Sequence, residues 1–182
     1  MNKFTQYARG VGFKKTEVSR TFNDSRGFYG KKTARGCAPE GVLFLFTDAD
    51  KLAECARGAM RNAYAPYSGY CVGAALLGKS GRVYIGCNIE NAAYSPSVCA
   101  ERAAVACAVS AGEREFEALA VCGGKGGVIA GPCPPCGVCR QTLREFCSDD
   151  FKVIVVDGPD SYVVHTLGEL LPHSFGRGNI EA

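Results

Sequence analysis

Long apolar runs are missing from the sequence. A membrane-spanning helix needs ~18 or more consecutive apolar residues, and no charge-free apolar segment of this chain approaches that length. The apolar core of a secretory signal peptide is also missing after Met1. The sequence therefore predicts a protein that neither spans a membrane nor is exported.

A strong overall charge is missing too. The 182 residues carry a formal net charge of +3, which by itself is too small to indicate a nucleic-acid partner. The charge is uneven, however, because residues 1–46 hold nine Lys and Arg against three acidic residues. We expect a basic N-terminal extension, residues 1–46, followed by one mildly acidic domain, residues 47–182. Frequent glycines favour a solvated extension, and a mitochondrial transit peptide is the alternative.

Cysteine is too scarce for a disulfide scaffold. The 11 cysteines make up about 6% of the chain, below the ~8–10% of small secreted disulfide proteins. Their number is odd as well. We therefore expect a reducing compartment, the cytoplasm, in which the cysteines serve as thiols or metal ligands.

The periodicity of apolar residues predicts an α/β fold. Helical spacing covers residues 48–63, 99–111 and 136–147, and strands are expected at 70–77, 82–86, 116–122 and 152–157, with a short strand at 161–165 and a short helix at 167–171. Residues 70–77 are apolar on both faces, which is typical of a central strand. The order of the elements predicts a three-layer sandwich, a mixed β-sheet flanked by helices.

Two cysteine clusters carry the chemistry. Cys136 and Cys139 lie three residues apart at the start of a predicted helix, and Cys99 begins another. Helix N-termini favour thiolates, and therefore metal binding. Three thiolates leave one tetrahedral position of a zinc ion open, as in catalytic sites. Cys133 is the alternative fourth ligand that would close the site, although the two prolines after it argue against that.

Two charged residues follow Cys99 closely. Glu101 is free to carry protons beside the metal, where zinc lowers the pKa of water. Arg102 is placed to offset the negative charge of three thiolates through hydrogen bonds to their sulfur atoms.

In sequence order, four segments resemble the small, zinc-dependent, homotetrameric cytidine deaminases. They are Ala63–Leu77 (AYAPYSGYCVGAALL), Gly86–Tyr94 (GCNIENAAY), Cys99–Arg102 (CAER) and Pro135–Gln141 (PCGVCRQ), and Leu170–Phe175 (LLPHSF) resembles the C-terminal end of the family. The resemblance runs from about Thr47 to Phe175 and leaves the extension out.

The resemblance implies a cytidine deaminase-like catalytic domain over residues 47–182. It implies hydrolytic deamination of cytidine and 2′-deoxycytidine in pyrimidine salvage, with one Zn²⁺ per chain. The zinc ligands would be Cys99, Cys136 and Cys139, and Glu101 would be the catalytic proton carrier.

The resemblance also implies the substrate-binding residues. Asn88 and Glu90 would hold the ribose, and Tyr70 and Ala100 would lie near the base. Phe175 would reach the active site of a neighbouring subunit, so that a homotetramer would share its sites. From the residues alone, Glu90 is alternatively a surface acid and Phe175 a plug of the core.

Tyr70 and Pro134 depart from the family pattern. Tyr70 stands where a phenylalanine is usual, and its hydroxyl needs a partner if it is buried. Pro134 stands where a small hydroxyl residue is common. Because neither position touches the ligands or Glu101, we expect a changed affinity more than a changed reaction.

Two other functions remain open. One is a deaminase of aminonucleoside antibiotics of the blasticidin type, which shares the cysteine motifs. The other, a nucleic-acid-binding or editing zinc protein, would use the basic extension, but the acidic domain argues against it. A small nucleoside is therefore the expected partner.

Overall fold

A mixed β-sheet forms the middle layer of the fold. The computed structural model describes residues 42–43 and 49–180, within the compact unit Ala34–Ala182. The strand order is β1-β3-β2-β4-β5-β6, in which β4 and β5 are parallel and the other neighbours antiparallel. The strands are β1 (Val42–Leu43), β2 (Tyr70–Gly78), β3 (Arg82–Cys87), β4 (Phe116–Lys125), β5 (Lys152–Val156) and β6 (Tyr162–Thr166).

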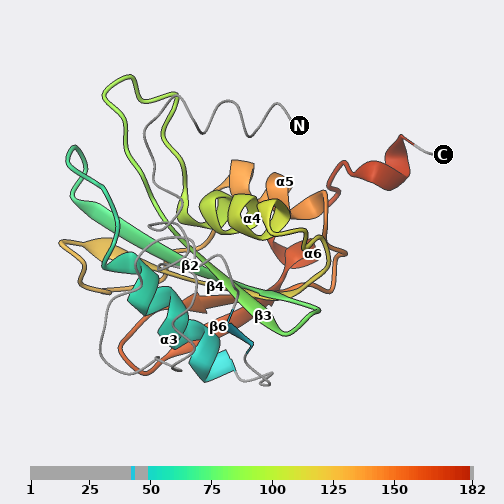
Figure 1. The fold of residues 1–182 in the computed structure, drawn as a ribbon, viewed down its shortest axis with the longest axis horizontal. Coiled ribbons are helices and arrows are strands. Elements are labelled where there is room, and N and C mark those ends of the chain that lie inside the picture. The colour runs from blue at the N-terminus through green and yellow to red at the C-terminus, as the bar shows by residue number, and fades with distance from the viewer. Residues whose placement is uncertain (1–41, 44–48, 181–182) are drawn as a thin grey trace, which may run out of the picture. The chain divides into compact units, whose positions relative to one another are not determined.

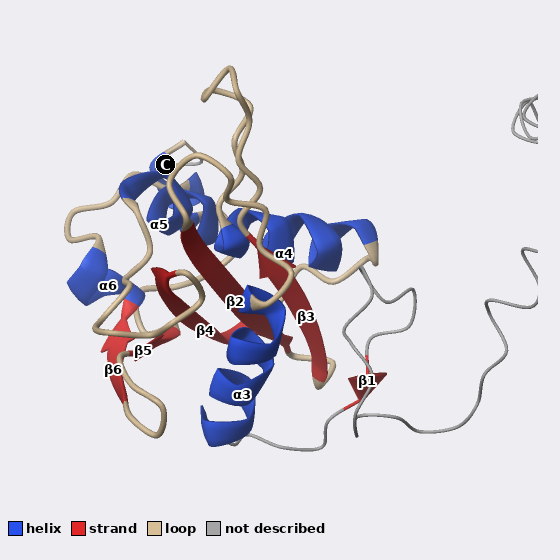
Figure 2. Cartoon of the chain, turned by 90° about the vertical axis from the view of Figure 1, so that its left-hand side faces the viewer, coloured by secondary structure: helices blue, strands red, loops and turns tan. Residues whose placement is uncertain are grey.

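Helices cover both faces of the sheet. Helix α3 (Ala49–Met60) packs on one face, while α4 (Ala100–Ser110) and α5 (Gly137–Arg144) lie on the other (Figure 1). The short helix α6 (Leu167–Leu170) and the 3-10 turn η1 (Arg177–Asn179) follow β6. The predicted three-layer sandwich is thus confirmed, and Figure 2 shows the layers from the side. None of the helices in the described ranges is long and apolar enough to cross a membrane.

The core divides into two clusters, one on each face of the sheet. Ala74 and Leu76 of β2 join the cluster under α4, whereas Ala75 and Leu77 join the cluster under α3. This alternation follows from the two-residue period of a strand. It confirms that residues 70–77 form a central strand with two apolar faces.

Several elements differ from the predicted boundaries. Helices α3 and α5 end at Met60 and Arg144, each three residues before its expected end. Strand β4 continues to Lys125, three residues past its expected end. Gly123 and Gly124 are poor strand formers, but pairing with Val72 and Cys71 of β2 keeps them in the sheet. Strand β1 was not expected and lies within the segment assigned to the basic extension. It pairs with β3, so two residues of that segment belong to the sheet.

Glycine lets each helix layer approach the sheet closely. A Cβ atom on Gly86 of β3 would lie 2.3 Å from the carbonyl oxygen of Ala100 and 2.5 Å from the amide nitrogen of Ala104, both in α4. On the opposite face, a Cβ atom on Gly73 would lie 2.1 Å from the carbonyl oxygen of Ala56 in α3. Backbone contacts of this kind tolerate no side chain, so Gly86 fixes the depth at which α4 sits.

Replacing Gly86 by alanine should push α4 away from the sheet. We expect Gly86→Ala to lower the free energy of unfolding by about 1–3 kcal/mol, the usual cost of overpacking, measured by urea unfolding. Gly58→Ala is the matched control, because a Cβ atom there meets nothing within 4 Å inside α3. That variant should be neutral or more stable by up to ~1 kcal/mol. Equal stability of wild type and Gly86→Ala would contradict the close approach.

Candidate metal centre and active site

Two helices begin at cysteines, and their first turns meet. Cys99 is the N-cap residue of α4, and Cys136 is the N-cap residue of α5. Both have the extended backbone that precedes a helix, with φ −74°, ψ 153° at Cys99 and φ −68°, ψ 166° at Cys136. Cys139, one turn into α5, is fully buried. Two distant segments thereby bring three thiols to one point.

The spacing of the three sulfur atoms fits a tetrahedral metal ion. The Sγ atoms of Cys99 and Cys136 are 3.8 Å apart, and those of Cys136 and Cys139 are 3.5 Å apart. All three lie within 4.8 Å of one another. Zn–S bonds of ~2.3 Å place two tetrahedral ligands about 3.8 Å apart. The group fits one Zn²⁺ per chain, and Cys133 is not part of it.

The electrostatics of the group also favour a cation. Burial raises the pKa of Cys99 and of Cys139, and the negative charges of Glu101 and the neighbouring thiols raise it further. Partial burial likewise opposes ionisation of Cys136, but the backbone N–H groups of Val138 and Cys139 and the adjacent thiols bring its pKa below the usual value. Cys136 thus ionises more readily than a free thiol, whereas Cys99 and Cys139 ionise less readily. Because three neighbouring thiolates repel one another, a positive ion is needed to hold all three in the ionised form.

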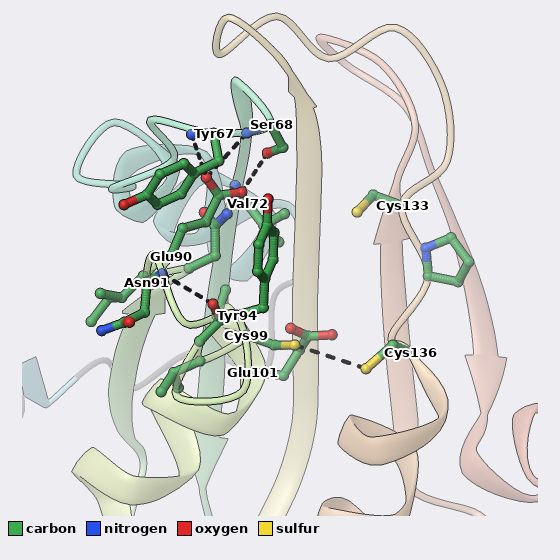
Figure 3. A pocket seen from close by; sticks show the side chains of 16 residues that line it. Tyr67, Ser68, Val72, Glu90, Asn91, Tyr94, Cys99, Glu101, Cys133 and Cys136 are labelled. Atoms are coloured by element: carbon green, nitrogen blue, oxygen red, sulfur yellow. Dashed lines mark hydrogen bonds between the residues drawn. The ribbon is translucent and has the colours of Figure 1, made fainter.

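Glu101 is buried beside this group. It is only 4% exposed and is the single buried charged residue among the described residues. Burial raises the pKa of its carboxyl, and the Cys139 thiol and the Arg102 charge offset this in part. Figure 3 shows the carboxylate between Cys99 and Cys136. A carboxyl group with a raised pKa is suited to take and return protons near neutral pH.

Arg102 lies within hydrogen-bonding reach of Cys99. Burial lowers the pKa of Arg102, but a hydrogen bond to Cys99 and the charges of Cys139 and Cys136 raise it above the ordinary value. Its Nη2 also donates to the carbonyl oxygen of Ser97 at 2.8 Å. The guanidinium is therefore placed to offset thiolate charge, as its sequence position suggested.

A pocket of about 440 Å³ opens at the metal group. This volume lies within the ~300–1,000 Å³ of small-molecule sites. The pocket brings together six of the residues singled out in the sequence, namely Asn88, Glu90, Cys99, Ala100, Glu101 and Cys136. Cys139 lies behind them in α5. One end of the pocket thus carries the thiols and Glu101, and the other carries Glu90 (Figure 3).

Backbone amides fix the carboxylate of Glu90. Its Oε2 accepts from the amide nitrogens of Tyr67 at 2.9 Å and Ser68 at 3.2 Å, and the Ser68 hydroxyl donates to Oε1 at 2.5 Å. The hydrogen bond from the Ser68 side chain and the Tyr67 amide lower the pKa of Glu90, so it is ionised. A free surface acid would lack such partners.

Asn88 is held by strand β2. Its Oδ1 accepts from the amide nitrogen of Val72 at 2.8 Å, and its Nδ2 donates to the carbonyl oxygen of Tyr70 at 2.8 Å. One N–H and one lone pair of the amide remain for a ligand. Asn88 therefore ties β2 to the pocket as well as lining it.

Tyr70 and Phe175 do not line this pocket in the single chain. Tyr70 is 39% exposed at the start of β2. Phe175 is 61% exposed, which excludes a core plug, and its carbonyl oxygen accepts from Nε2 of Gln141 at 2.9 Å. Arg140 donates to Leu170 from the preceding position. Residues 140 and 141 thereby tie the C-terminal segment to α5.

Sequence reasoning missed several residues of the site. The amides of Tyr67 and Ser68 are backbone donors, which residue identity does not reveal. Cys133 was considered only as a metal ligand, and Tyr94 was named only as the end of a matched segment, yet both line the pocket. Tyr94 has a left-handed backbone, φ 58°, and its ring centroid lies 6.2 Å from that of Tyr67. A left-handed non-glycine residue is a signal that only the structure provides.

The chain is similar to known deaminases over most of its length. The family model for the "cytidine and deoxycytidylate deaminase zinc-binding region" matches residues 47–156. A cytidine deaminase of Sporosarcina psychrophila is 44% identical, covering 73% of this chain and 95% of the relative. One from Halalkalibacterium halodurans is 44% identical over 70% and 94% of the two chains.

Solved structures agree with these sequence relatives. The cytidine deaminase of Burkholderia pseudomallei has a TM-score of 0.63 at 42% identity, covering 69% of this chain and 97% of that one. The cytidine deaminase of Mycobacterium tuberculosis has a TM-score of 0.61 at 40% identity, covering 72% and 99%. The thiol group of Cys99, Cys136 and Cys139 lies within the matched residues. The chain therefore belongs to the cytidine and deoxycytidylate deaminase family that this zinc-binding region defines.

Proposed function

We propose that the chain catalyses the hydrolytic deamination of cytidine and 2′-deoxycytidine to uridine and 2′-deoxyuridine. The observation that carries the proposal is the burial of Glu101 in one pocket with three thiols at metal-ligand spacing. The relatives named cytidine deaminase support the same substrate. Water adds to carbon 4 of the pyrimidine, and ammonia leaves.

Cys99, Cys136 and Cys139 would hold the zinc. When bound, zinc supplies a Lewis acid that lowers the pKa of water from ~15.7 towards ~7. Glu101 takes the proton that the attacking water loses and gives it to ring nitrogen 3. It then takes the proton of the new hydroxyl at carbon 4 and delivers it to the departing amine, so that ammonia leaves and the carbonyl of uridine forms. Arg102 keeps the thiolates charged.

The opposite end of the pocket would hold the sugar. The ionised carboxylate of Glu90 is turned toward the pocket and anchored by Tyr67 and Ser68. A carboxylate accepts from ribose hydroxyls and repels a phosphate. The remaining N–H and lone pair of Asn88 suit the same hydroxyls. Both residues favour a free nucleoside over a nucleotide or a polynucleotide.

We propose a homotetramer with shared sites. Tyr67 and Tyr94, which line the pocket, are 53% and 74% exposed, and Phe175 in the C-terminal segment is 61% exposed. Large exposed apolar side chains gathered in this way favour a protein interface. Phe175 lines no part of its own pocket, so it is available to a neighbour. Our placement in the cytoplasm rests on the low and odd cysteine count. Nine cysteines of the described residues are free, whereas Cys107 is disulfide-bonded. The role that we expect for residues 1–46 falls almost entirely outside the described residues.

Loss of one thiol should release the metal. We expect Cys99→Ala to hold far less than one zinc per chain by atomic absorption, because two thiolates alone bind zinc weakly. Cys55→Ala is the matched control, since Cys55 lies in α3 on the opposite face of the sheet. That control should keep about one zinc per chain. Full zinc content in Cys99→Ala would remove Cys99 from the ligand set.

Loss of the proton carrier should stop turnover but keep the metal. Glu101→Gln preserves the shape of the side chain, so we expect zinc content near wild type and a fall in kcat of at least ~10²-fold. The assay is the loss of ultraviolet absorbance of cytidine. Glu117→Gln, at an exposed position of β4, is the control and should behave as wild type. Substantial turnover by Glu101→Gln would refute the mechanism.

Shared sites should permit complementation between two inactive chains. We expect Phe175→Ala and Glu101→Gln each to be poorly active alone. Co-expressed with different tags and purified as mixed oligomers, they should turn over cytidine well above the sum of the separate chains. A site with intact Glu101 then receives Phe175 from its neighbour. Activity equal to that sum would mean that Phe175 does not serve a neighbouring site.

A further inference from the structure

Cys133 faces the pocket without belonging to the metal group. It lines the cavity next to Pro134 and Cys136, and its Sγ lies outside the set of three clustered sulfur atoms. Figure 3 shows it on the side of the pocket opposite Glu90. Glu101 and Cys99 are its charged neighbours. Cys133 therefore lines the side of the pocket across from Glu90, and the charges of Glu101 and Cys99 act on it.

Cys133 and Tyr70 both pack against Gly123 of β4, which has no side chain. A Cβ atom on Gly123 of β4 would lie 2.7 Å from Sγ of Cys133 and 2.9 Å from Cε1 of Tyr70. Gly123 pairs with Val72 of β2, which lines the pocket. The missing side chain leaves room for both groups to rest against the strand. Tyr70 thus lies next to Cys133 against β4, and of the two only Cys133 lines the pocket.

A hydrogen bond joins the two side chains. Burial raises the pKa of Tyr70, and the hydrogen bond to Cys133 raises it further. Burial also raises the pKa of Cys133, and the same hydrogen bond offsets part of that rise. The Tyr70 hydroxyl and the Cys133 thiol are therefore hydrogen-bond partners. The hydroxyl that sequence analysis left without a partner thus has one.

The backbone after Cys133 is fixed. Pro134 and Pro135 each lock their φ angle, and Pro135 is fully buried. The carbonyl oxygen of Pro135 accepts from Nε of Arg140 in α5 at 2.7 Å. The segment that follows Cys133 is therefore held against α5.

The orientation of the base follows from the proposed function, on which this inference rests. The amino-bearing carbon 4 must lie at the thiol group, and the ribose must lie toward Glu90. Glu101, on α4, must face ring nitrogen 3 to protonate it. The opposite edge of the ring, carbons 5 and 6, then faces the segment before α5, where Cys133 and Pro134 lie.

We propose that Cys133, held in place by Tyr70, sets the size of substituent that the enzyme accepts at carbon 5 of the pyrimidine. The thiol occupies the space next to the carbon that neighbours the reacting one. A smaller side chain there admits a larger 5-substituent, and a larger side chain excludes it. Tyr70 acts as a positioning residue for the thiol.

The ratio of kcat/KM for 5-methylcytidine to that for cytidine tests the proposal. One methylene in a pocket changes such ratios by ~10-fold or more. We expect Cys133→Ala to raise the ratio about 10-fold and Cys133→Leu to lower it about 10-fold. Cys55→Ala, across the sheet, should leave it unchanged. A merely structural defect lowers turnover of both nucleosides together and does not move the ratio in opposite directions.

Tyr70→Phe separates the positioning role. Removing the hydroxyl leaves the Cys133 thiol without its partner. Tyr70→Phe should therefore raise the ratio of kcat/KM for 5-methylcytidine to that for cytidine when Cys133 is present. The same substitution should raise this ratio less when Cys133 is already replaced by alanine. This non-additivity is what a double-mutant cycle measures for contacting residues.

The outcomes distinguish the inference from the function beneath it. Turnover of cytidine by wild type with an unchanged ratio in both Cys133 variants overturns the inference alone. No turnover of either nucleoside by zinc-loaded wild type overturns the proposed function and the inference with it.

Discussion

The contact between the first turns of α4 and α5 is the constraint on which the site depends. It places three sulfur atoms within 4.8 Å of one another, although Cys99 lies 37 residues before Cys136. Three ionised thiols at that spacing repel each other, so the arrangement is stable only with a cation among them. Residues elsewhere in the fold hold the two helices in position for this contact. Gly86 lets α4 lie against the sheet, and Arg140 ties the start of α5 to Pro135.

The pocket combines a buried acid with a solvated one. Glu101 is almost fully buried, and its carboxyl has a raised pKa, whereas Glu90 is only partly buried and its carboxyl has a lowered pKa. Two carboxylates of one pocket are thereby suited to different work. In the proposed mechanism the buried one exchanges protons, and the other stays charged and binds hydroxyls. The distance between the two ends gives the substrate its direction in the pocket.

Much of the fold could be predicted from the sequence, because the signals were local. Strand β2 has two apolar faces, and α4 is rich in alanine and begins directly after Cys99. Both elements were therefore predicted at nearly the right residues. The end of β4 was missed because Gly123 and Gly124 are held by pairing with β2, which is not a local property. The two residues of β1 carry too little pattern to be recognised.

The site was predictable where side chains do the chemistry and not where the backbone does. The three thiols and Glu101 followed from motif and spacing. The amides that anchor Glu90 and the bond from Tyr70 to Cys133 join segments far apart in sequence. The unusual Tyr70 was visible in the sequence, but its partner was not.

X-ray absorption at the zinc edge tests the central claim most directly. The account predicts three sulfur neighbours at ~2.3 Å and one lighter neighbour, nitrogen or oxygen, in wild type. Cys133→Ala should give the same spectrum, because Cys133 lies outside the ligand group. Four sulfur neighbours in wild type, falling to three in Cys133→Ala, would mean a closed structural site and would contradict the account.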